Sequence, residues 1–220
     1  SDPNKAGRFS AFLIRVGRVQ YLILTLIASG FVVFGKYFIT DIYATPAYAQ
    51  AYPVALLLIL PALVPLIQNL GIEIQRAMNQ HRFRSMIYSA MALLNVVVSI
   101  PLAKRYGPPG AALGTTISLI VGNGLIMNVF YARKLGLDIA GFWKSIARLS
   151  LGLPVPAAMG ACILWSAHFG NIWQFLVGIL LYTAVYCISM WLFGMNGEEK
   201  QLVRKPLQKI FGRLRHGDNH

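Results

Sequence analysis

The sequence has 220 residues, of which 56% are hydrophobic and only 12% are charged, and its mean hydropathy is +0.58. A soluble domain carries about 25% charged residues, so this composition excludes a water-soluble globule and favours an integral membrane protein. The formal net charge is +13, which would suit nucleic acid or an anionic lipid surface, and the placement of the charges has to decide between the two.

The first part of the chain, residues 1–20, is basic and amphipathic. Basic and apolar residues fall on different faces at helical spacing, a pattern typical of a helix that lies on a lipid surface. Arg15 and Arg18 are either lipid-headgroup contacts or guides for an anionic substrate. The first membrane crossing is expected over residues 21–38, which is near the shortest length that spans ~30 Å of hydrocarbon. Lys36, near its far end, can snorkel outward.

The second crossing is expected over residues 53–77 and contains Pro61 and Pro65. Proline in a membrane helix frees backbone carbonyls and kinks the helix, and it is tolerated where neighbouring groups or water bond those carbonyls. The third crossing is expected over residues 86–103 and the fourth over residues 111–131. A stripe of small residues recurs every four positions: Gly110, Gly114, Ser118 and Gly122. Such a stripe predicts close packing against another helix.

The remaining apolar runs predict a fifth crossing over residues 149–167 and a sixth over residues 172–193. Residues 139–146, ahead of the fifth, are expected to lie flat at the interface. The tail contains apolar residues at the spacing of a second amphipathic surface helix: Leu207, Ile210, Phe211 and Leu214. The expected organisation is therefore a basic lead-in (1–20), a six-helix transmembrane domain (21–193) and a basic tail (194–220).

The Lys and Arg residues are distributed unequally between the two sides that six crossings define. Seventeen of the 20 fall on one side, and only Lys36, Lys104 and Arg105 fall on the other. Cytoplasmic loops are enriched in Lys and Arg, so both chain ends are expected in the cytoplasm. The high positive charge is then a topology signal and a contact with anionic lipid headgroups, and no nucleic-acid partner is expected.

No pattern in the sequence predicts an enzyme, a metal site or a cofactor. The chain has seven acids, of which only Glu73 falls within an expected crossing, and its four histidines are scattered. Paired carboxylates, metal-ligand spacing and a nucleophile beside a base are all missing from the sequence. Cys162 and Cys187 lie in apolar runs, where they are expected to act as small hydrophobic residues.

Polar residues within the crossings are the candidate functional residues, because burying them in lipid is costly unless they face a cavity or a partner. Glu73 is either an interfacial acid paired with Arg76 or a group that handles substrate or ions. Gln68, Asn69 and Asn95 either make interhelical hydrogen bonds or line a hydrated path. Asn123 and Asn128 on the fourth crossing leave the same two alternatives open.

Two stretches carry a combination of features that resembles a known family. They read IQNLGIEIQRAMNQHRFRS and ALLNVVVSIPLAKRYGPPGAALGTTIS, and the features are Gln75, Arg76, Asn95, Tyr106, Gly107, Gly110, Ala111 and Ala112. Their order and spacing resemble the C-terminal region of bacterial polysaccharide flippases of the multidrug/oligosaccharidyl-lipid/polysaccharide exporter superfamily. The resemblance is strongest over residues 55–135.

The resemblance implies an all-α membrane protein of two lobes of about six helices each, which rock about a central cavity. This chain would be a piece of such a protein: the later part of the second lobe plus trailing helices, without the N-terminal lobe. The implied activity is transfer of undecaprenyl-diphosphate-linked oligosaccharide across the bacterial inner membrane by alternating access, for O-antigen, capsule or exopolysaccharide synthesis. The implied partners are membrane lipids, the lipid-linked oligosaccharide, the missing lobe and, as an open alternative, a glycan polymerase.

Under this hypothesis the substrate-binding candidates are Arg76, Gln68, Asn69, Asn95 and Arg18, because cations would attract the diphosphate and amides would bind sugar hydroxyls. Two alternatives stay open. A cation-coupled multidrug exporter of the same superfamily would need an essential membrane acid, for which Glu73 is the candidate. A membrane scaffold that recruits glycan-assembly enzymes would depend on the basic tail.

Overall fold

The computed structural model describes residues 3–43, 45–78, 81–166, 169–202 and 204. In this part of the chain every regular element is a helix, in this order: α1 (Pro3–Tyr37), π-helix η1 (Phe38–Tyr43), 3₁₀-helix η2 (Pro46–Tyr48), α2 (Ala51–Ile67), α3 (Asn69–Ala77), α4 (His81–Tyr106), α5 (Pro108–Leu119), π-helix η3 (Ile120–Met127), α6 (Asn128–Arg133), α7 (Ile139–Leu149), 3₁₀-helix η4 (Ser150–Gly152), α8 (Pro154–Ser166), α9 (Ile172–Ser189) and π-helix η5 (Met190–Gly194). The expected all-α architecture is confirmed for the described residues.

Five helical stretches are long and apolar enough to cross a membrane: Ala6–Tyr43, Ala51–Ala77, Arg82–Tyr106, Pro108–Arg133 and Ile172–Gly194. A sixth results if Ile139–Gly152 and Pro154–Trp165, which are bent by 53° relative to each other, form one broken span. The protein is therefore a multi-pass membrane protein by length and composition. The bend falls at Pro154, which lacks the N–H that would continue the preceding turn.

Two expected boundaries differ from the structure. The basic lead-in and the first crossing are one continuous helix, α1, which passes through position 20 without a break. The lead-in also packs within the protein, because Leu13 is fully buried and Gly17 approaches the ring of Phe142 on α7 so closely that a side chain there would clash. Residues 139–146 likewise belong to a longer helix, α7, whose Phe142 is fully buried. The expected tail helix at 207–214 lies outside the described residues.

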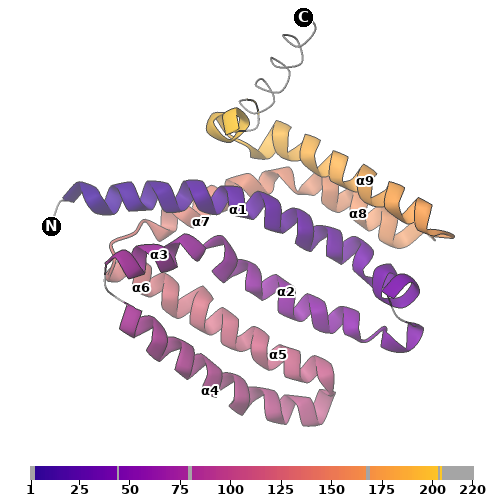
Figure 1. Ribbon diagram of the computed structural model, residues 1–220, viewed down its shortest axis with the longest axis horizontal. Helices are drawn as coiled ribbons and strands as arrows, with labels where there is room; N and C mark the ends of the chain where they lie inside the picture. Colours follow the sequence, from indigo (N-terminus) through magenta and orange to yellow (C-terminus); the bar gives the residue numbers. More distant parts are fainter. Residues whose placement is uncertain (1–2, 44, 79–80, 167–168, 203, 205–220) are drawn as a thin grey trace, which may run out of the picture.

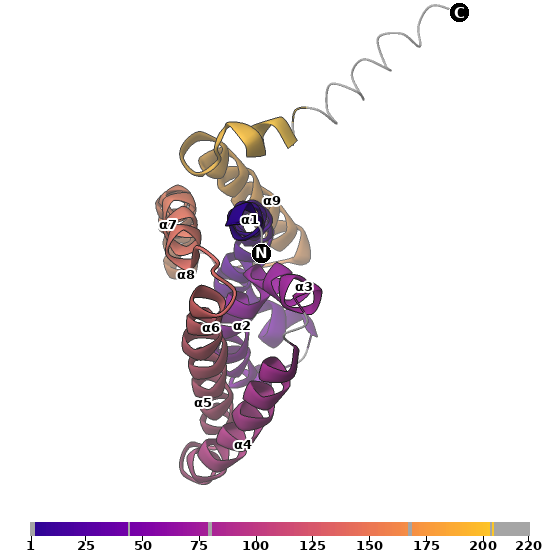
Figure 2. The ribbon, with the colours of Figure 1, turned by 90° about the vertical axis from the view of Figure 1, so that its left-hand side faces the viewer.

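The helices lie side by side, and their connections collect at two ends (Figure 1). One end holds the α1–α2, α4–α5 and α8–α9 connections. The other end holds the N-terminus, the α3–α4 connection and the α6–α7 connection. Figure 2, turned by 90°, shows the α4–α5 hairpin at one edge of the assembly and α9 near the opposite edge.

The stripe of small residues makes the close contact that its spacing predicts. A Cβ atom on Gly114 would lie 2.7 Å from the Cα atom of Ser99 on α4, and one on Gly110 would overlap the carbonyl of Leu102. The backbones of α4 and α5 therefore touch, as small residues in membrane helices allow. The tight turn between them depends on Gly107, whose φ of +66° is favourable only for glycine.

One carbonyl that a proline frees in helix α2 is bonded by a neighbouring helix. Pro61 cannot donate to the carbonyl of Leu57, one turn earlier. The hydroxyl of Thr116 on α5 donates to that carbonyl instead. This contact fastens α2 to α5 at the point where the α2 ladder is interrupted.

Candidate functional site

The helix that carries the two prolines breaks at Gln68, between α2 and α3. Gln68 has φ −101° and ψ 13°, outside regular α-helical geometry, and its side chain is 3% exposed. The side chain of Gln20 on α1 covers the break. With its amide oriented so that both polar atoms are satisfied, the nitrogen donates to the carbonyls of Leu66 and Ile67 at 3.2 Å each. The break directs the amide of Gln68 into the interior.

Asn128 receives that amide and connects three parts of the fold. Its Oδ1 accepts from Gln68 Nε2 at 2.6 Å and from Trp143 Nε1 of α7 at 3.2 Å. Its Nδ2 donates to the carbonyls of Asn123 and Gly124, at 3.1 and 2.7 Å. A buried amide is costly unless it is hydrogen-bonded, and here both polar atoms of Asn128 are satisfied. The bonds to the 123 and 124 carbonyls fall at the end of π-helix η3.

Arg84, near the first turn of α4, lies beside this amide cluster and is half-buried. Its NH2 donates to the hydroxyl of Tyr88 at 2.5 Å, and its NH1 donates to the hydroxyl of Tyr131 at 3.4 Å. Its guanidinium carbon is 4.5 Å from the centre of the Tyr88 ring, a cation–π contact. The Tyr88 hydroxyl donates in turn to Asn123 Oδ1 at 3.0 Å.

The cation therefore has only neutral hydrogen-bonding partners in the described part of the chain. The three ion pairs found there are Arg15–Glu198, Arg18–Glu199 and Arg76–Glu73, and none includes Arg84. A cavity of about 10 Å³ between Arg84, Gln68, Asn123 and Tyr131 has room for about one water. Tyr88 is 37% exposed, so the site can be reached from the surface.

We call these residues the arginine–amide cluster: Gln68, Arg84, Tyr88, Asn123, Asn128, Tyr131 and Trp143. The cluster joins the α2–α3 break, the start of α4, the η3–α6 junction and α7. Its chemistry is one positive charge, three hydroxyl or indole groups and three amides. Such a set can bind a phosphate and hydroxyl groups, and it has no acid or base placed for covalent chemistry.

The other residues predicted from the sequence fall outside the cluster. Glu73 and Arg76 pair with each other on the exposed side of α3, at 3.0 Å, with 58% and 68% of their side-chain surface exposed. Asn69 is also exposed. Of the two alternatives for Glu73, the ion pair with Arg76 is the one present in the structure.

Asn95 serves the α4–α5 contact. Its Oδ1 accepts from Ser99 on the same helix at 2.5 Å and from Thr115 on α5 at 3.3 Å. Ser99 also donates to the Ala111 carbonyl at 3.2 Å. Of the two alternatives for this amide, the interhelical hydrogen bond is therefore the one observed.

Arg18 lies in a buried ion pair on the wall of an open pocket of about 500 Å³, which Arg15 and Ser145 also line. Its side chain contacts both carboxylate oxygens of Glu199, and NH1 donates to the carbonyl of Ser145 at 2.8 Å. Arg18 is 5% exposed and Glu199 is 3% exposed. The substrate or lipid contact predicted for Arg18 stays a prediction: Arg18 lines this pocket together with Arg15, and its guanidinium is bonded to Glu199, Ser145 and Gly194.

Sequence reasoning did not single out Arg84, the aromatic members of the cluster or Glu199 as site residues. Tyr88, Tyr131 and Trp143 are amphipathic, and a buried hydroxyl or indole N–H usually needs a partner. A search for such groups near the intramembrane amides could have found them. Glu199 had no such signal, because it lies in a polar tail and its partner is 181 residues away.

No three His, Cys, Asp or Glu side chains come together in the described residues in a way that could hold a metal ion. Comparison with protein-family models, with curated proteins and with solved structures finds no match.

Proposed function

We propose that this chain is part of a transporter that moves an undecaprenyl-diphosphate-linked oligosaccharide across the bacterial inner membrane. The observation that supports the proposal is Arg84. It lies in the first turn of α4, at the end of the stretch Arg82–Tyr106 that is long and apolar enough to span a membrane, and its hydrogen-bonding partners in the described part of the chain are neutral. Arg84 is half-buried and takes part in none of the ion pairs found in the described residues, so a diphosphate would provide the anion for a charge-assisted hydrogen bond.

The cluster also suits alternating access. It lies where α2 breaks into α3 and where the π-helix η3 meets α6, and such interruptions recur at hinges and functional sites. In the proposed cycle Arg84 binds a phosphate oxygen on the side of the cluster that Tyr88 exposes, the Tyr88 hydroxyl turns from Asn123 to the same headgroup, and a change at the α2–α3 break alters access to the cluster. No covalent step is needed.

The test is glycan export in cells that depend on this protein, with Arg84→Gln compared with Arg82→Gln. Arg82 is exposed and two positions away, so it is a matched control for charge. A charge-assisted hydrogen bond contributes about 1.5–3 kcal/mol, which predicts a loss of export on the order of 10- to 100-fold for Arg84→Gln. Arg82→Gln is expected to export normally. Normal export by Arg84→Gln at equal protein level would contradict the proposal.

The alternatives give different outcomes in the same cells. A cation-coupled exporter would lose activity in Glu73→Gln and on removal of sodium or addition of an uncoupler. A scaffold would lose partner recruitment on deletion of the tail while export by the remaining machinery continued. The exposed Glu73–Arg76 pair resembles an ordinary surface ion pair, so we expect Glu73→Gln to export normally.

A further inference from the structure

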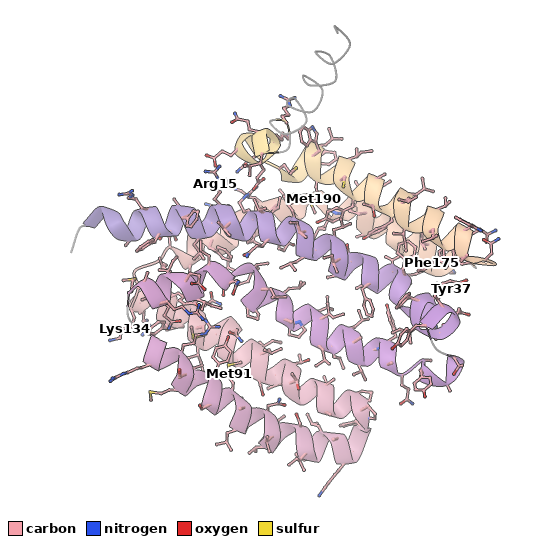
Figure 3. The ribbon with its side chains drawn as sticks, in the orientation of Figure 1. Arg15, Tyr37, Met91, Lys134, Phe175 and Met190 are labelled. Carbon is pink, nitrogen blue, oxygen red and sulfur yellow. The ribbon has the colours of Figure 1, made fainter. Side chains whose placement is uncertain are left out.

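An open pocket of about 370 Å³ lies where α1 runs into η1 and meets α8 and the residues before α9. It is at the opposite end of the helices from the α3–α4 connection, beside which Arg84 lies. Figure 3 shows Tyr37 and Phe175 at this end and Lys134 at the other. The pocket is thus separate from the arginine–amide cluster.

One side of the pocket is aromatic and held in place by its surroundings. The rings of Tyr37 and Phe169, which both line it, are 5.0 Å apart, and the Tyr37 hydroxyl donates to the Phe169 carbonyl at 2.9 Å. Behind them Phe175 lies 5.1 Å from Tyr37 and 5.8 Å from Phe34. These contacts fix the aromatic wall before any ligand arrives, which lowers the entropic cost of binding.

The other side carries one positive charge, one negative charge and a hydroxyl. Lys36 and Asp41 both line the pocket and are exposed, and neither is in an ion pair within the described residues. Thr40 lies between them, and its single hydroxyl proton is shared between the Lys36 carbonyl, at 3.0 Å, and the Asp41 carboxylate. Thr40 and Asp41 are on π-helix η1, a conformation that is rare and frequent at functional sites.

We propose that this pocket binds an uncharged sugar ring. The C–H face of a pyranose packs on aromatic rings, and its hydroxyls can accept from the Lys36 ammonium and donate to the Asp41 carboxylate. The opposite charges cancel, so the pocket favours a ligand with many hydroxyls and no net charge. Its volume is at the lower end of the ~300–1,000 Å³ typical of small-molecule sites, which suits one sugar unit with part of its neighbour.

The choice of a glycan as the natural ligand rests on the proposed function, in which the sugars are delivered at the end opposite the basic loops. The binding site itself rests on the pocket. Since Lys36 and Asp41 are exposed, Lys36→Met and Asp41→Asn are expected to fold normally. Lys104→Met, another exposed lysine at the same end, is the matched control.

The experiment uses the whole 220-residue chain in lipid nanodiscs and saturation-transfer-difference NMR. The probes are the methyl glycosides of glucose, galactose, mannose, rhamnose and N-acetylglucosamine, with methyl glucuronide as the charged comparison. We expect at least one neutral glycoside to bind, with the strongest signals on its ring C–H protons. Lys36→Met or Asp41→Asn should weaken its affinity about 10-fold, and Lys104→Met should not change it.

The inference is overturned if no neutral glycoside gives a signal, if binding is the same in Lys36→Met and Asp41→Asn, or if the glucuronide binds more tightly. Failure of this inference is distinguishable from failure of the proposed function. Loss of export in Arg84→Gln with no sugar binding would leave the transport proposal standing alone. Sugar binding together with normal export by Arg84→Gln would support the sugar-binding pocket and contradict the proposed role of Arg84 in transport.

Discussion

Replacing Arg18 by Ala should destabilise the protein more than any other single loss of an ion pair described here. Glu199 is 3% exposed, and the change leaves its carboxylate without the guanidinium, with the N–H of Asn196 at 2.9 Å as a remaining donor. It also removes the donors to the carbonyls of Ser145 and Gly194, at 2.8 and 3.3 Å. Breaking a buried ion pair on one side costs about 3–5 kcal/mol because an uncompensated charge remains.

The assay is reversible unfolding in mixed micelles, followed by circular dichroism. Arg15→Ala is the control, because its pair with Glu198 is long, 3.8 Å, and 55% and 71% exposed, and exposed pairs contribute about 0–1 kcal/mol. The double variant Arg18→Met/Glu199→Leu should recover most of the loss, since removing both charges also removes the desolvation cost. If Arg18→Ala lowers the free energy of unfolding no more than Arg15→Ala does, the Arg18–Glu199 pair does not hold residues 194–202 against α1.

Two further predictions concern the packing of α5. Gly114→Ala should lower the free energy of unfolding by about 1–3 kcal/mol, because the new methyl group would meet the backbone of Ser99. Gly124→Ala is the control, since a methyl group has space there and should be neutral or stabilising. Equal effects of the two variants in the same unfolding assay would contradict the close contact between α4 and α5. Thr116→Val should cost about 1–3 kcal/mol by leaving a carbonyl without its donor. In a Pro61→Leu background, Thr116→Val should lower the free energy of unfolding by less, because the introduced leucine has a backbone N–H that can bond the Leu57 carbonyl. If the two substitutions have additive effects in this double-mutant cycle, the Thr116 hydroxyl does not replace the missing N–H.

The long helices could be predicted from the sequence because an apolar run of about 20 residues has few other stable structures in lipid. Their ends could not, since backbone geometry at a boundary depends on tertiary neighbours. The basic lead-in illustrates the difference. Its amphipathic pattern suits a surface helix, and the same apolar face packs equally well against α7, where Leu13 and Phe142 are fully buried.

The candidate site was predictable only in part. The rule that intramembrane amides need partners correctly singled out Gln68 and Asn128, which bond to each other at 2.6 Å. The sequence could not show which cation is enclosed and which is available, because the answer depends on acids that are distant along the chain. Arg18 meets Glu199 across 181 positions, whereas Arg84 meets two tyrosines.

The contrast between these two arginines leads to a prediction about Tyr88. A carboxylate in its place would lie four residues after Arg84 on the same helix face, where opposite charges attract. Tyr88→Glu should therefore keep or slightly raise stability, while the new carboxylate competes with a phosphate for the guanidinium. Tyr88→Gln has no negative charge and is the control for loss of the ring. In the export assay we expect Tyr88→Glu to fall well below Tyr88→Gln, and equal export would mean that the charge of Arg84 is not used on an anionic substrate.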